Sequence, residues 1–122
     1  MSIAEKNNEH FVQEQTAWLK TLERLRLENL LLKNKLIEII KKEISKEQLE
    51  RAEFFHGLFL DKDTVIALLR RDIARQAAKA VPDNAGQNGY MHEQEKLKDD
   101  ISRMEKEFTT VKEAFNRFVT SI

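Results

Sequence analysis

The sequence predicts an all-α protein, an elongated antiparallel three-helix bundle with coiled-coil-like packing. Apolar residues recur at alternating spacings of three and four in three separate stretches, which places each set along one face of a helix. The 122 residues also contain only three Gly and one Pro, so little in the chain interrupts a long helix. This length favours a single helical-bundle domain spanning residues 1–122.

The first predicted helix covers about residues 3–44. Ser2 and Glu5 form a capping-box pattern, and neither Gly nor Pro occurs before Gly57. The stripe of this helix is Phe11, Gln15, Trp18, Leu22, Leu25, Asn29, Leu32, Leu36 and Ile39. Three long antiparallel helices with a Trp inside the first resemble the plan of spectrin-type repeats, a likeness of architecture that implies no functional residue.

A second capping-box pattern, Ser45 with Gln48, predicts a tight reversal at residues 44–46 and a second helix over about residues 46–80. If the chain instead continues as one helix through Ser45, an extended coiled coil replaces the hairpin. The stripe of the second helix is Ala52, Phe55, Phe59, Lys62, Ile66, Leu69, Ile73, Gln76 and Ala80.

Residues 81–89 are rich in Pro, Gly, Asn and Asp, which predicts a surface loop because these residues favour turns. A third helix is expected over about residues 90–121. Its stripe is Tyr90, Leu97, Ile101, Met104, Phe108, Val111, Phe115, Phe118 and Ile122.

The charge balance and the lack of Cys exclude several classes of function. Twenty-one basic residues balance twenty-one acidic ones, so no overall field attracts nucleic acid or an anionic membrane. Without Cys the chain has no disulfide, thiolate zinc site or cysteine nucleophile. No uncharged stretch approaches a membrane span or a signal peptide, so we expect a cytoplasmic protein. No nucleophile elbow or phosphate-binding loop is present, so we expect no enzyme and no catalytic residues.

One polar residue interrupts the apolar stripe of the first helix at its middle. Asn29 stands among Leu residues, where a buried amide sets helix register at some cost in stability. Antiparallel pairing of the first two helices brings three charged residues to its level, which predicts a buried polar layer. Its predicted members are Asn29, Asp61, Lys62 and Asp63. An internal ligand or ion site is the alternative interpretation.

Glu53 and His56 have the Glu-x-x-His spacing found in carboxylate-bridged di-iron bundles. Such centres need two of these motifs and two further Glu residues, and this chain has one motif. We therefore expect a solvated pair, no metal site and no cofactor. Gly57 costs roughly 1 kcal/mol relative to Ala inside a helix, which predicts close packing against a neighbouring helix or, failing that, a kink.

The apolar residues are unevenly distributed along the predicted bundle. Six Phe residues are expected in the half near Ser45, whereas Gln15, Gln76 and Gln94 occupy stripe positions in the other half. The six are Phe54, Phe55, Phe59, Phe108, Phe115 and Phe118.

The first helix has more apolar surface than two neighbouring helices are expected to cover. The additional residues are Leu30, Ile37, Ile40 and Ile44. An uncovered apolar patch typically marks an interface, so the sequence predicts a non-enzymatic interaction or scaffold module that binds protein, first of all a second copy of itself. A monomer that buries these residues is one alternative. A bundle that binds a small molecule or metal at its aromatic end is another.

Overall fold

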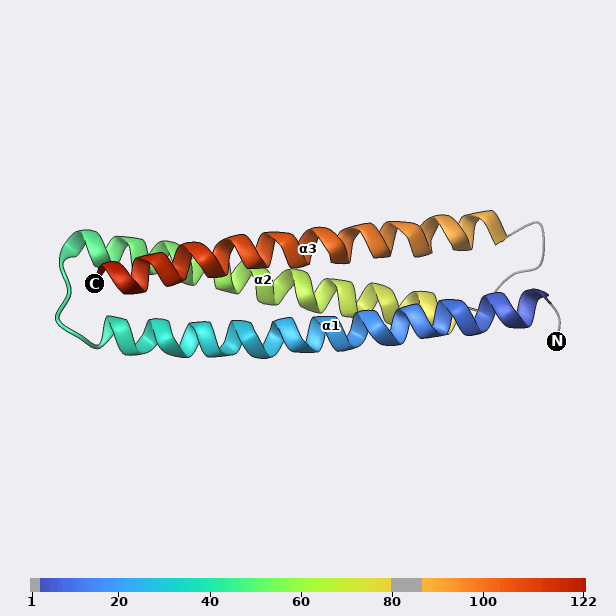
Figure 1. Cartoon of the computed structure of the whole chain (residues 1–122), viewed down its shortest axis with the longest axis horizontal. Coiled ribbons are helices and arrows are strands. Elements are labelled where there is room, and N and C mark those ends of the chain that lie inside the picture. The colour runs from blue at the N-terminus through green and yellow to red at the C-terminus, as the bar shows by residue number, and fades with distance from the viewer. Residues whose placement is uncertain (1–2, 80–86) are drawn as a thin grey trace.

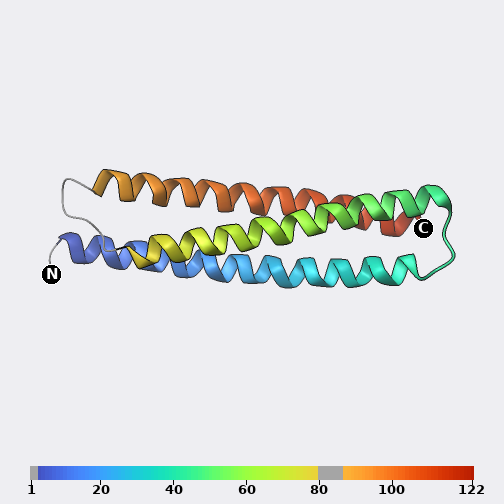
Figure 2. The same ribbon diagram turned by 180° about the vertical axis from the view of Figure 1, so that it is seen from behind.

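The computed structural model describes residues 3–79 and 87–122 and shows three long α-helices packed side by side. They are α1 (Ile3–Ile40), α2 (Lys46–Ala78) and α3 (Gln87–Ser121). In Figures 1 and 2, α1 and α3 run in the same direction and α2 runs antiparallel to both, which makes a narrow rod. The predicted all-α antiparallel three-helix bundle is therefore confirmed, and no strand occurs within the described ranges.

The reversal between α1 and α2 occurs where the capping box predicts it. The Ser45 side chain accepts a hydrogen bond from Gln48 N–H at 3.1 Å, and the Gln48 side chain accepts one from Ser45 N–H at 2.9 Å. These bonds satisfy backbone donors that the first turn of a helix leaves free, so Ser45 starts a new helix. The alternative of one continuous helix through Ser45 is wrong.

The predicted helix ends differ from the observed ones by a few residues. The first helix ends at Ile40 rather than residue 44, and the second ends at Ala78 rather than residue 80. The third begins at Gln87, so residues 87–89 of the predicted loop are helical. Three predicted features lie outside the described residues: most of that loop, the cap at Ser2 and the stripe position Ala80. Helix ends are set by individual hydrogen bonds, which periodicity does not report.

Stripe residues of all three helices form two connected core clusters. The first surrounds Trp18 and occupies the middle of the bundle and the half away from the reversal; its buried members are Trp18, Leu22, Leu25, Ile66, Leu69, Ile73, Leu97, Ile101, Met104 and Phe108. The second, which we call the aromatic cluster, lies near the reversal; its buried members are Leu36, Ile39, Ala52, Phe55, Phe59, Phe115 and Phe118.

The distribution of Phe residues agrees in part with the prediction. Four of the six belong to the aromatic cluster, and Phe54 lies in the same half beside Phe55 but is 65% exposed. Phe108 lies in the Trp18 cluster. The rings of Phe59 and Phe115 meet edge to face at 5.1 Å between centroids. A ligand pocket inside the aromatic cluster would require such rings to separate.

Gly57 does not pack closely against another helix. A Cβ atom added at this position meets no atom within 4 Å, and α2 continues as an α-helix through it. The prediction of close packing is therefore wrong, and no helix break replaces it. The residue faces open space on the outside of the bundle, where the fold of one chain gives no reason for a glycine.

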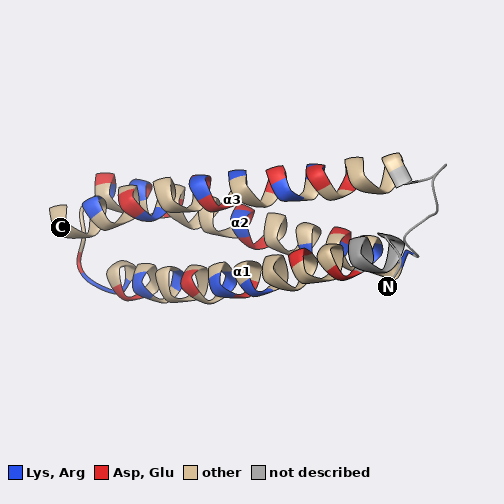
Figure 3. Ribbon diagram, turned by 45° about the vertical axis from the view of Figure 1, so that its right-hand side comes forward, with Lys and Arg blue, Asp and Glu red and all other residues tan. Residues whose placement is uncertain are grey.

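Charged side chains of both signs are interspersed along the helices (Figure 3). Within the described parts of the chain, no helix has a stretch long and apolar enough to cross a membrane.

Candidate interaction surface

Three of the four residues predicted as an uncovered apolar arc are exposed. Leu30, Ile37 and Ile40 are 42%, 49% and 40% exposed, whereas Ile44 is partly buried against the aromatic cluster. Ile44 follows the end of α1 and lies in the connection to α2, so it departs from the helical path that the prediction assumed. The other three remain on the helix surface.

The second helix extends this surface. Lys33 of α1 forms an ion pair with Asp63 of α2, so these two side chains mark the flank where α1 and α2 meet. Ile40 follows Lys33 by one heptad and Leu49 precedes Asp63 by two, so both lie on that flank. We use the name α1–α2 face for the exposed side chains there: Leu27, Leu30, Ile37, Ile40, Leu49 and Leu60.

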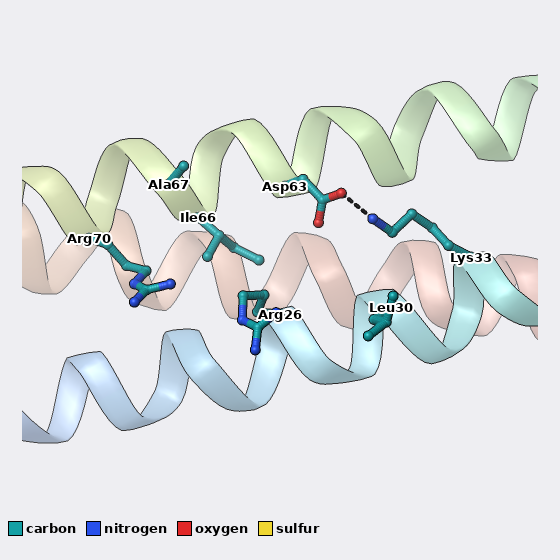
Figure 4. Close-up of a pocket in the computed structure, with 7 residues that line it drawn as sticks. All are labelled: Arg26, Leu30, Lys33, Asp63, Ile66, Ala67 and Arg70. Carbon is teal, nitrogen blue, oxygen red and sulfur yellow. Dashed lines mark hydrogen bonds and ion pairs between the residues drawn. The ribbon is translucent and has the colours of Figure 1, made fainter.

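A shallow hollow of about 270 Å³ lies within this face (Figure 4). Leu30 forms part of its wall from α1, and Ile66 and Ala67 form part of its wall from α2. The ion pair between Lys33 and Asp63 spans one end of it. Leu30 and Ala67 therefore lie at neighbouring levels on one side of the bundle.

Arg26, in the α1 wall of the hollow, is held by a carboxylate of its own helix. Its guanidinium donates two hydrogen bonds to Glu23, at 2.9 and 2.7 Å. Chiefly through this hydrogen bonding, Arg26 lowers the pKa of the Glu23 carboxyl, and the same bond raises the pKa of Arg26. Both side chains thus stay charged at neutral pH.

The predicted polar layer exists around Asn29, with a different membership. Asn29 is fully buried and its Nδ2 donates to the Phe59 carbonyl oxygen at 2.9 Å and to Asp63 Oδ1 at 2.7 Å. Lys33 completes the group through Asp63. Asn29 Oδ1 has no hydrogen-bond partner among the described residues. The layer connects α1 to α2 and sets their register.

Two predicted members of that layer are placed elsewhere. Asp61 is exposed on α2 and therefore lies outside the layer. The Lys62 ammonium lies 3.3 Å from a Glu107 carboxylate oxygen of α3, so Lys62 links α2 to α3 instead. Successive helix residues point about 100° apart, so side chains adjacent in sequence serve different helix contacts.

A second buried polar group, which the sequence marked only as polar stripe positions, lies where α1 and α3 begin. Gln15 Nε2 donates to Tyr90 Oη at 3.0 Å and to Gln94 Oε1 at 3.2 Å. Gln76 Nε2 donates to Gln94 Oε1 at 3.3 Å, and Gln94 Nε2 donates to the Phe11 carbonyl oxygen at 3.3 Å. One Gln per helix thus connects all three helices.

The remaining candidate residues, Glu53 and His56, lie on the surface of α2. Both are exposed, as a solvated pair would be. Among the described residues, no three His, Asp or Glu side chains are grouped so that they could hold a metal ion.

A second apolar surface lies on the flank between α2 and α3. Val65 and Leu68 are exposed beside a hollow of about 350 Å³ that also includes Asp100 and Arg103 of α3. Charged residues of both helices line this hollow, as they do the hollow of the α1–α2 face.

Comparisons of the chain with protein-family models, with curated proteins and with solved structures found no match.

Proposed function

We propose that the protein is a non-enzymatic helical interaction module that associates with a second copy of itself through the α1–α2 face. The observation that carries this proposal is the exposure of six large aliphatic side chains on one flank of the bundle. Several large apolar side chains exposed on one flank are typical of protein interfaces, because covering them removes apolar area from water.

The charges bordering the face favour a copy of the same chain as the occupant. Glu23 and Glu53 supply negative charge, and Lys41 and Arg71 supply positive charge. A surface that carries both signs at its border complements itself in a two-fold arrangement, whereas a uniformly charged partner would meet like charges.

The test is the solution mass measured by light scattering after size exclusion over a concentration series. We expect a dimer that dissociates on dilution, and we expect Ile37→Lys to shift the equilibrium strongly toward monomer. Ile37 is 49% exposed, so the variant should retain its helical circular dichroism.

The matched control is Val65→Lys on the flank between α2 and α3. Val65 is 38% exposed and lies beside Asp100 and Arg103 of α3, outside the α1–α2 face. This variant should associate as the wild type does. A wild-type protein that stays monomeric at every concentration, or equal effects of the two substitutions, would contradict the proposal.

A further inference from the structure

We infer that the second copy docks with its two-fold axis parallel to the helices, so that α1 of each copy lies over α2 of the other and Gly57 receives Ile37 of the partner copy. This inference rests on the proposed self-association and adds its geometry. It is derived from the outward residues of the two helices and from the register between them.

The register between α1 and α2 is set by the Asn29 layer. Asn29 bonds to the Phe59 carbonyl and to Asp63, and Lys33 pairs with Asp63. Residues 29–33 of α1 therefore lie level with residues 59–63 of α2. A two-fold axis parallel to the helices preserves these levels, so each α1 residue meets the α2 residue of the other copy at its own level.

Large outward residues of α1 are level with small outward residues of α2. A line of residues spaced four and three apart runs along the outside of α1: Glu23, Leu27, Leu30, Asn34, Ile37 and Lys41, of which Glu23 is half-buried and the others are exposed. The corresponding residues of α2, in reverse order, are Arg71, Ala67, Thr64, Leu60, Gly57 and Glu53. Leu27 thus meets Ala67, Leu30 meets Thr64 and Ile37 meets Gly57. Leu60, the large α2 residue in this stretch, meets Asn34. Large side chains opposite small ones fill an interface without overlap.

This arrangement accounts for Gly57. A glycine inside a helix is unfavourable, and within one chain nothing lies within 4 Å of the position its Cβ would take. Gly57 of α2 is level with Ile37 of α1 in the same chain. Because the two-fold axis preserves levels, it brings Ile37 of the second copy to the open space at Gly57. The missing side chain leaves room for that contact.

The charges at both ends of the face agree with the same axis. Glu23 of one copy meets Arg71 of the other, and Lys41 meets Glu53. The N–H of Lys41 donates to the Ile37 carbonyl at 3.1 Å, which keeps Lys41 on the helical path just beyond α1. Opposite charges therefore face each other at both borders of the apolar residues.

A charge-reversal cycle distinguishes this arrangement from its main competitor. An axis perpendicular to the helices would place α1 on α1 and α2 on α2, so that Lys41 would meet Glu23 and Glu53 would meet Arg71. Under our arrangement, Lys41→Glu and Glu53→Lys should each weaken dimerisation about ten-fold at low salt, and the double variant should recover most of the loss. Under the perpendicular axis, the double variant should be weaker than either single one.

Gly57→Leu supplies a steric test that does not depend on charge. It should weaken dimerisation by about ten-fold or more, while the monomer keeps its fold because the substitution adds a good helix former at an open position. Sedimentation equilibrium would measure the dimer dissociation constants of all four variants.

The possible results separate the arrangement from the proposed function. A wild-type protein without any dimer would overturn the self-association itself. A wild-type dimer whose double charge variant does not recover, or whose Gly57→Leu variant dimerises normally, would overturn only the arrangement.

Discussion

Two Phe residues five positions apart on α2 provide a sharp test of the packing. Phe59 is 0% exposed, and its ring lies 5.1 Å from Phe115 and 6.4 Å from Phe55, measured between centroids. Phe54 is 65% exposed and its ring contacts Phe55 at 5.8 Å. Truncating a buried Phe to Ala costs about 3–5 kcal/mol, because apolar burial is lost and a cavity remains. Truncating an exposed one usually costs less than about 1 kcal/mol.

We therefore expect Phe59→Ala to lower the free energy of unfolding by about 3–5 kcal/mol and Phe54→Ala to lower it by less than about 1 kcal/mol. Urea unfolding followed by helical circular dichroism, at concentrations where the protein is monomeric, measures both values. Phe59→Leu, a smaller truncation, keeps the comparison measurable if Phe59→Ala no longer folds. Equal losses for positions 54 and 59 would refute the packing described above.

Three further predictions concern other parts of the bundle. Gly57→Ala should raise the free energy of unfolding of the dilute monomer by about 1 kcal/mol in urea, since a Cβ there meets no neighbour; a loss would show that the site is covered. A double-mutant cycle of Asn29→Ala and Asp63→Ala should give a coupling of about 1 kcal/mol or more from their 2.7 Å hydrogen bond, and additive losses would show that the bond contributes nothing. Because Arg26 lowers the pKa of Glu23 in the folded state, their pair stabilises the fold above the ordinary carboxyl pKa and loses this effect as pH falls through the lowered value. The difference in urea midpoint between wild type and Glu23→Gln should therefore vanish in acid, and a difference that is independent of pH would contradict this assignment.

The positions of the core residues could be predicted from the sequence because a helix repeats every 3.6 residues. Leu22, Phe59 and Phe115 each belong to a predicted stripe, and each is fully buried. The reversal at Ser45 was also predictable, since its capping box is local and needs only four residues.

The candidate sites were predictable only in part. The sequence identified Asn29 as a buried polar residue, and its burial is confirmed. It did not distinguish Asp63, which bonds to Asn29, from Asp61, which is exposed. Asp61 and Asp63 both lie close to the level predicted for Asn29 along the bundle. A shift of two residues in helix register, or a different direction around the helix, decides which carboxylate reaches the Asn29 amide.

The sequence by itself thus determined three helices, the place of the first reversal and the line of each buried stripe, because these depend on periodicity and on local hydrogen bonds. Only the tertiary structure decided which residues beside a stripe are covered. It partly covered Ile44, and it left Phe54, Ile37 and the site of Gly57 open. Whether a residue at the edge of a stripe is buried depends on the position of the neighbouring helix and on the size of its side chains at that level. The periodicity of one helix does not contain either of these.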